Sequence, residues 1–373
     1  MIYLDHNATS PVRPEAKVAV LRALEVGGNP SSVHAAGRAA RALIETARAQ
    51  VAALVGVVPG SVTFTSGGTE SNALAIESAV TAGYDRILLG ATEHGAVAEN
   101  VRAAGVPVAV WPVDANGVAD LDWLATELGK GGRLLVCLML ANNETGVIQP
   151  VAEASALVRE AGGWLHVDAV QAAGKIAIDF TALGADTLAL AAHKIGGPFG
   201  SGALVAGTRA TLVRRLHGGG QERGRRAGAE NLSGIAGFGV AAVAAARDLP
   251  AIAAQAPWRD TLQDRVEAAG VVILGKAAPR LPQTLGFAAQ GFDAQMQVMG
   301  MDLAGVAISA GPACSSGKMK PSDVVAAMGR ADLAPFAVRI SGGWNTTQED
   351  WVRAGDAWLD LYARHASRRK EVA

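Results

Sequence analysis

Short apolar runs alternate with helical stretches over the first two-thirds of the chain. The apolar runs predict strands buried in a core, at 87–89, 106–113, 134–140, 164–167, 187–191 and 203–206. Helical spacing predicts helices between most of them, at 70–80, 96–103, 121–128 and 151–161, and an earlier helix at 35–55. This alternation is typical of right-handed crossovers and of a mostly parallel sheet flanked by helices. We therefore expect an α/β fold.

The pattern changes in the last third of the chain. A long alanine-rich helical stretch begins at Leu232 and is interrupted near Pro250 and Pro257. Beyond it the sequence predicts short strands at 271–274, 284–288, 307–309 and 337–340 and a closing helix at 348–365. We expect a large domain over residues 15–255, and a smaller α+β domain formed by residues 1–14 and 256–373.

Composition and charge exclude several classes of function. Half of the 373 residues are apolar, which supplies a sizeable core and argues against a disordered chain. Lys plus Arg is 33 and Asp plus Glu is 34, so neither nucleic acid nor an anionic membrane is the expected partner. The first residues lack the basic region of a signal peptide, and no apolar run approaches the ~20 residues of a membrane span. The expected location is the cytoplasm.

Polar side chains follow the ends of several predicted strands, where ligands bind in an open parallel sheet. Lys194 comes directly after one strand and before a glycine-rich turn. Desolvation there lowers the pKa of a lysine and frees its amine to form a Schiff base, although a solvated loop lysine is the commoner case. Asp168 closes another strand and needs a cationic partner, such as the pyridinium nitrogen of pyridoxal phosphate, unless it caps a helix.

Other polar residues suit the same kind of ligand. The segment Ser-Gly-Gly-Thr-Glu-Ser at 66–71 opens a predicted helix, where backbone N–H groups either face an anion or simply cap the helix. It lacks the Gly-Lys-Ser/Thr ending of a Walker loop. His94 could stack on a flat ring or shuttle protons. Arg339, in an otherwise apolar strand, suits either a carboxylate ligand or a structural salt bridge.

The two cysteines differ in their surroundings. Cys137 lies inside an apolar run and is expected to be buried and inert. Cys314 lies among small residues with glycines at both ends of the segment, which predicts an accessible loop thiol able to act as a nucleophile or persulfide carrier. Two cysteines cannot build a disulfide framework, and His166 with Asp168 has no third metal ligand at a sensible spacing. No intrinsic metal site is expected.

Taken in order, these segments resemble the cysteine desulfurases, the NifS/IscS-like group of the class V aminotransferase family. The resemblance implies a fold-type I enzyme that uses pyridoxal 5'-phosphate. The segments that carry it are Tyr3-Leu-Asp-His-Asn-Ala-Thr, Gly28-Asn-Pro-Ser-Ser, Thr65-Ser-Gly-Gly-Thr-Glu-Ser-Asn, Thr92-Glu-His, Asn142-Asn-Glu-Thr-Gly, His166-Val-Asp-Ala-Val-Gln, His193-Lys, Gly218-Gly-Gly-Gln-Glu-Arg-Gly, Ala313-Cys-Ser-Ser-Gly and Val338-Arg-Ile-Ser.

The resemblance also implies a role for each matching residue. Lys194 would be the Schiff-base lysine, Asp168 would pair with the pyridinium nitrogen, and Gln171 would pair with the phenolic oxygen. His94 would stack on the ring and act in proton transfer. The phosphate would be held by Gly68, Thr69 and His193, while Asn143 would lie near cofactor and substrate and Arg339 would take the substrate carboxylate.

The activity implied is removal of sulfur from L-cysteine, giving L-alanine and a persulfide on Cys314. A homodimer is implied, as is sulfur transfer to an iron–sulfur scaffold or another acceptor, with at most a transient iron–sulfur contact at Cys314. A selenocysteine lyase or a class V aminotransferase is the alternative on the same fold. A partner-binding platform that has lost its cofactor is the alternative from another class.

Two departures from the family pattern concern the phosphate. Ala191 stands where many members have a serine, and Ala229 stands where many have a threonine contributed across the dimer. Because two hydroxyl groups that could bind the phosphate are missing, we predict weaker binding of the cofactor in an otherwise functional enzyme. Pro312, two residues before Cys314, also replaces the commoner serine or alanine and would stiffen the loop.

Overall fold

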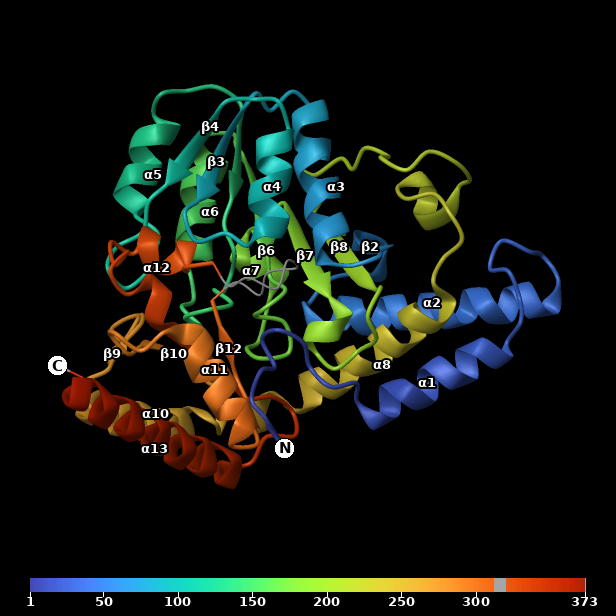
Figure 1. Cartoon of the computed structure of the whole chain (residues 1–373). Coiled ribbons are helices and arrows are strands. Elements are labelled where there is room, and N and C mark those ends of the chain that lie inside the picture. Colours follow the sequence, from blue (N-terminus) through green and yellow to red (C-terminus); the bar gives the residue numbers. More distant parts are fainter. Residues whose placement is uncertain (312–319, 373) are drawn as a thin grey trace.

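The computed structural model describes residues 1–311 and 320–372, so Pro312 and Cys314 lie outside the described residues. Within them, a seven-stranded sheet forms the centre of the larger part (Figure 1). Neighbouring strands from β7 to β4 are parallel, whereas β8 is antiparallel to both β7 and β2. The mostly parallel sheet is therefore confirmed. Its strands, in spatial order, are β2 (Val62–Thr65), β8 (Gly202–Ala206), β7 (Thr187–Ala191), β6 (Trp164–Asp168), β5 (Leu134–Cys137), β3 (Arg86–Gly90) and β4 (Val108–Trp111).

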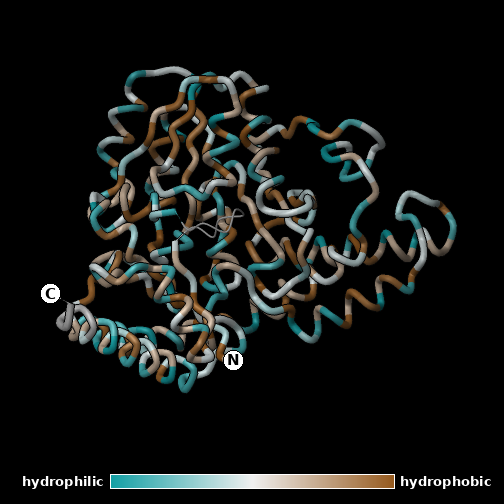
Figure 2. Tube along the Cα trace, in the orientation of Figure 1, coloured by the Kyte–Doolittle hydropathy of each residue, from teal (hydrophilic) through white to brown (hydrophobic). Residues whose placement is uncertain are grey.

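Helices cover both faces of this sheet, which explains why its central strands are apolar throughout (Figure 2). Along β5, Leu134 and Val136 pack into a core with α2, α5, α6 and α8, while Leu135 and Cys137 pack into a second core with α3 and α4. The alternation follows from the two-residue period of a strand. The helices are α2 (Ala35–Leu54), α3 (Gly68–Thr81), α4 (Gly95–Ala103), α5 (Leu121–Leu128), α6 (Val151–Glu160), the short α7 (Phe180–Leu183) and α8 (Leu232–Arg247).

The prediction of a buried strand at 106–113 is wrong in one respect. The strand β4 covers only Val108–Trp111 and lies at the edge of the sheet, where Val108 and Val110 are 40% and 59% exposed. An edge strand has a neighbour on one side only, so an apolar run does not by itself establish burial.

The long helical stretch after Leu232 is interrupted as predicted. Pro250 lies in the first turn of α9 (Leu249–Ala253) and Pro257 in the first turn of α10 (Ala256–Ala268). Proline is accepted there because the first N–H groups of a helix have no partner within it. Among the described residues, no single helix is long and apolar enough to cross a membrane, although α8 together with 249–268 passes that test across a 58° bend.

The smaller part of the fold has its own sheet and core. In place of the single strand expected at 307–309, the structure has two short strands in different sheets. The first, β11 (Val306–Ala307), pairs with β1 (Ile2–Tyr3), whereas the second, β12 (Ser309–Ala310), pairs with β13 (Ala337–Ser341). A third core contains Leu4 and residues between 262 and 358 and is separate from the two cores of the large sheet. The two-domain division stays a prediction, which these separate cores support. The remaining strands are β9 (Val272–Ile273) and β10 (Thr284–Ala288).

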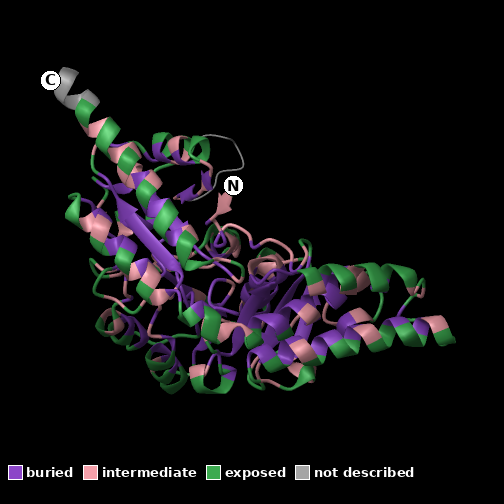
Figure 3. Ribbon diagram, turned by 90° about the horizontal axis from the view of Figure 1, so that it is seen from below, coloured by how far each residue is buried: buried purple, intermediate pink, exposed green. Residues whose placement is uncertain are grey.

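Two of the four helices that the sequence analysis did not predict have exposed apolar residues. On α1 (Pro14–Glu25) Val18, Leu21 and Leu24 are exposed, and α11 (Ala294–Leu303) likewise turns methionines and a leucine to solvent. Apolar residues on the outer face obscure the usual amphipathic pattern. Figure 3 shows that the helices carry exposed residues on one side and buried residues on the other. The set is completed by α12 (Asp323–Ala327) and α13 (Gln348–Val372).

Candidate active site

The residues expected to bind a cofactor meet at the carboxyl edge of the large sheet. Lys194 ends a short helical turn after β7, Asp168 is the last residue of β6, and Gly68 begins α3. All eight predicted cofactor residues line one pocket of about 240 Å³. A neighbouring pocket of about 630 Å³ shares Lys194 and His94 with it and is bordered by Arg339 and Gly311. The predicted substrate-binding arginine therefore lies beside the predicted cofactor pocket.

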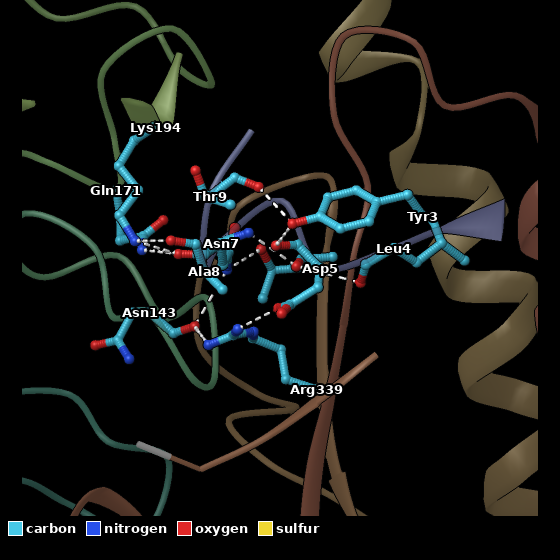
Figure 4. Close-up of polar contacts among 12 residues, drawn as sticks. Tyr3, Leu4, Asp5, Asn7, Ala8, Thr9, Asn143, Gln171, Lys194 and Arg339 are labelled. Atoms are coloured by element: carbon cyan, nitrogen blue, oxygen red, sulfur yellow. Dashed lines mark hydrogen bonds and ion pairs between the residues drawn. The ribbon is translucent and has the colours of Figure 1, made fainter. Parts of the chain in front are cut away.

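The amine of Lys194 is held by backbone carbonyl groups from the N-terminal segment (Figure 4). Its Nζ donates to the carbonyl oxygens of Asn7 at 2.5 Å and Ala8 at 2.8 Å. Burial and the charge of Arg339 lower the pKa of Lys194 from 10.5 to about 8, against the opposing effect of Asp5 and Asp168. A lysine with such a pKa carries a substantial fraction of free amine near neutral pH, which nucleophilic attack requires.

Asp168 is oriented by a chain of buried hydrogen bonds. Its Oδ2 accepts from Asn72 Nδ2 at 2.8 Å, and its Oδ1 accepts from the Val170 amide at 2.9 Å. Asn72 Oδ1 lies 2.9 Å from His166 Nε2, and His166 Nδ1 lies 2.9 Å from the Thr187 hydroxyl. Because burial lowers the pKa of His166 to about 3, the ring is neutral and donates through Nε2. This series of hydrogen bonds fixes the orientation of the Asp168 carboxylate.

This arrangement argues against the metal-pair interpretation of His166 and Asp168. Both ring nitrogens of His166 already have protein partners, so neither is free to coordinate a cation. Within residues 1–311 and 320–372, no group of three or more potential ligands could hold a metal ion. The sequence analysis missed Asn72, although it closes the quoted segment 65–72.

His94 caps the N-terminus of α4 and lines the same pocket as Lys194. Its Nδ1 accepts from the Ala96 amide at 3.0 Å, and burial lowers the pKa of the ring. The neutral ring therefore carries its proton on Nε2. The turn before it is tied to the segment after β5, where Glu93 accepts from the Met139 amide and Asn142 donates to the Thr92 carbonyl at 3.1 Å.

The first turn of α3 borders the pocket, and the N–H groups of such a turn can bind an anion. Gly68 and Thr69 line the pocket together with His193 and Ala191. A Cβ atom at Gly68 would lie 2.9 Å from a methyl group of Val170, so only glycine fits this approach. Burial and the charge of Lys194 lower the pKa of His193 to about 4, so this ring is neutral. Ala229 borders a different pocket, beside Arg226.

Residues 5–9 were quoted for the resemblance but received no role, yet they connect the site. Asn7 accepts through its carbonyl from Lys194 and from Gln171 Nε2 at 2.7 Å, and its Nδ2 donates to the Asn143 carbonyl at 3.2 Å. Gln171 Oε1 in turn accepts from the buried Lys175 at 2.8 Å. No local pattern marks these residues, since their partners lie far along the chain.

Comparison with known proteins agrees with this geometry. The model of the family described as Aminotransferase class-V matches residues 2–353. The chain is 38% identical over 360 residues to the cysteine desulfurase IscS of Dictyoglomus turgidum, covering 94% of this chain and 91% of that protein. It is 41% identical over 384 residues to a cysteine desulfurase of Frankia sp., covering 95% and 90%. The X-ray structure of a NifS-like protein from Rickettsia africae superposes with a TM-score of 0.87 and 34% identity, over 97% of this chain and 99% of that one.

Proposed function

The chain belongs to the aminotransferase class-V family, and on that premise we propose that it removes sulfur from L-cysteine, yielding L-alanine and a persulfide on Cys314. The observation that carries the proposal is the meeting of Lys194, Asp168, His94 and Arg339 around two adjoining pockets. Relatives named cysteine desulfurase over more than nine-tenths of the chain supply the reaction.

The residues of the pocket fit pyridoxal phosphate. The N-terminal turn of α3 suits the phosphate, Asp168 suits the protonated ring nitrogen, and the Gln171 amide suits the phenolic oxygen. Lys194 supplies the amine for covalent attachment. When bound, the cofactor supplies an electron sink for the carbon next to the substrate nitrogen.

The remaining groups bind the substrate and move protons. Lys194 Nζ, with its lowered pKa, accepts the proton that leaves the substrate carbon, and His94 Nε2 can donate a proton. Arg339 borders the larger pocket, where its guanidinium would bind the substrate carboxylate.

The assignment of the nucleophile to Cys314 rests on sequence and on chain length. Gly311 borders the larger pocket, and Cys314 follows it by three residues, a span of at most ~10 Å. The other cysteine, Cys137, is fully buried in β5, where burial raises its pKa well above the usual value. The thiolate required for attack on sulfur is thus disfavoured at Cys137.

Two further parts of the proposal concern partners. We propose a homodimer, supported by the exposed apolar residues Val18, Leu21 and Leu24 on one helix. We also propose that the persulfide sulfur passes to an iron–sulfur scaffold or another sulfur acceptor, supported by the names of the relatives. Light scattering of the purified protein tests the dimer, and a monomer at micromolar concentration would contradict it.

The test of the main proposal is turnover of L-cysteine by the purified protein with added pyridoxal phosphate and a thiol reductant. We expect alanine and sulfide in equal amounts. Pyruvate-dependent exchange of the amino group without sulfide release would identify an aminotransferase instead. Turnover of selenocysteine alone would identify a lyase. If the protein showed no turnover and no cofactor absorbance, the result would support a partner-binding platform without catalytic activity.

Restoring two hydroxyl groups is expected to tighten cofactor binding. The Ala191→Ser hydroxyl would border the pocket beside Gly68, and Ala229→Thr would restore the residue that many members contribute across a dimer. A hydrogen bond to a charged group contributes about 1.5–3 kcal/mol, so the double variant should bind pyridoxal phosphate ~10²–10⁴-fold more tightly. Equilibrium dialysis measures the affinity, and equal values for the double variant and the natural chain would contradict the prediction.

Covalent attachment of the cofactor should depend on pH through Lys194. Because its pKa is lowered to about 8, the reactive amine should increase as the pH rises through 8 rather than through 10.5. Arg339 contributes to this lowering, so Arg339→Gln should move the midpoint to higher pH. Brief incubation of cofactor-free protein with pyridoxal phosphate, followed by borohydride trapping and mass spectrometry, gives the initial rate. A midpoint that stays in place in the variant would contradict the assigned cause.

A further inference from the structure

Arg339 already forms an ion pair within the protein, without any bound substrate. Its NH2 donates to Asp5 Oδ1 at 2.6 Å, and its NH1 donates to the Asn143 carbonyl at 2.8 Å (Figure 4). The arginine side chain is 5% exposed and the Asp5 side chain 19% exposed, so solvent screens this ion pair little. Within the described part of the chain, Nε is the nitrogen of the guanidinium that lacks a partner.

The backbone fixes Asp5 in front of Arg339. Residues on both sides of it join β13, because His6 N donates to the Ser341 carbonyl at 3.1 Å and Ser341 N donates to the Leu4 carbonyl at 2.8 Å. Tyr3 Oη donates to the Thr9 carbonyl at 2.8 Å and also lies 3.2 Å from the Asp5 carbonyl oxygen. Asp5 is therefore a built-in carboxylate at the edge of the substrate pocket and has little freedom to withdraw.

A second carboxyl group near Arg339, that of Glu144, contacts a serine hydroxyl instead of the guanidinium. Glu144 lies 2.5 Å from the Ser322 hydroxyl, and burial raises its pKa, which favours the neutral form. Glu144 forms no ion pair with Arg339 in the described residues. The counterion of the arginine is therefore Asp5.

We propose that Asp5 is a specificity-determining residue that neutralises Arg339, so that a ligand carboxylate binds only when the rest of the molecule also contacts the site. The inference rests on the proposed role of Arg339 as the carboxylate-binding residue. A second carboxylate gives the cluster of Arg339 and Asp5 a net negative charge, because one guanidinium then serves two anions. Contacts made by the substrate amine and thiol must offset that repulsion, which excludes simple carboxylates.

The test is binding of propionate, which has the substrate carboxylate but neither its amine nor its thiol. Asp5→Asn removes the charge and keeps an oxygen that can accept from Arg339. Isothermal titration of the holoenzyme should show propionate binding about tenfold more tightly in Asp5→Asn than in the natural chain. Propionate should also become a better competitive inhibitor, and the KM for L-cysteine should fall while kcat changes less.

A matched variant separates charge from stability. Asp248→Asn breaks another ion pair, Asp248 with Arg13, whose side chains are 19% and 3% exposed, and Asp248 does not border either pocket. It should leave propionate affinity unchanged. Arg339→Gln should remove propionate binding in both the natural chain and Asp5→Asn. If Asp5→Asn does not fold, Asp5→Ser supplies the same test.

Two outcomes would overturn the inference. Propionate binding no tighter in the neutral variants than in the natural chain would show that Asp5 does not oppose carboxylates. A raised KM with unchanged propionate affinity would show that Asp5 only orients the arginine. Failure of the proposed desulfurase activity is a separate result, because the natural chain would then release no alanine while the propionate titrations still report on Asp5.

Discussion

Replacing Lys194 by alanine is expected to lower alanine release from L-cysteine by at least ~10³-fold, because both covalent attachment and proton transfer depend on its amine. The amine is held at 2.5 and 2.8 Å by two backbone carbonyl groups, and its lowered pKa provides free base near pH 8. No other lysine borders either pocket of the described site, so a neighbouring amine cannot take its place.

Turnover under saturating pyridoxal phosphate measures the loss, and borohydride trapping shows whether the cofactor still attaches. Lys175→Met is the matched control, since it removes a second buried lysine that binds Gln171 outside the pocket. Trapped cofactor should remain on Lys194 in that control. If Lys194→Ala kept more than about a tenth of the activity, the assignment of the amine would be wrong.

Replacing Cys314 by alanine is expected to reduce both sulfide and alanine release by at least ~10³-fold, because the thiolate that accepts the substrate sulfur is lost. The cofactor should still attach to Lys194, so the absorbance of the bound cofactor should be retained. Labelled sulfur from ³⁵S-cysteine should be found on the natural chain and be absent from the variant.

The other cysteine supplies the control for this experiment. Cys137→Ala removes a thiol that is fully buried in β5 and should keep the ³⁵S label. If Cys314→Ala still released sulfide at the natural rate, the persulfide would have to form elsewhere. Loss of activity with cysteine but not with selenocysteine would favour the lyase alternative.

The sequence was sufficient for those parts of the site that depend on local order. Asp168 and Lys194 could be located because each follows an apolar strand, and the carboxyl ends of parallel strands meet at one edge. Gly68 could be located because it begins a helix directly after a strand. Each of these inferences used only neighbouring residues, and the structure brings all of them to one pocket.

Residues that act through distant partners could not be predicted in the same way. Asp5 and Arg339 are separated by 334 positions, and nothing in either local sequence indicates that they form an ion pair. Asn72 and Asp168 are separated by 96 positions, and the sequence analysis gave Asn72 no role. The roles of the cofactor-binding residues came from the resemblance rather than from such patterns, and they stay proposals until the variants are measured.

The order of synthesis gives the connection between residues 5 and 339 a further consequence. Residues 4–6 leave the ribosome long before Arg339 and Ser341 exist, so the bonds that join them to β13 cannot form while the large sheet is being synthesised. At 5–20 residues per second, the delay is on the order of 15 to 70 seconds. A chain that stalls before β13 therefore lacks the ion pair of Asp5 with Arg339, even if every strand of the large sheet has been synthesised.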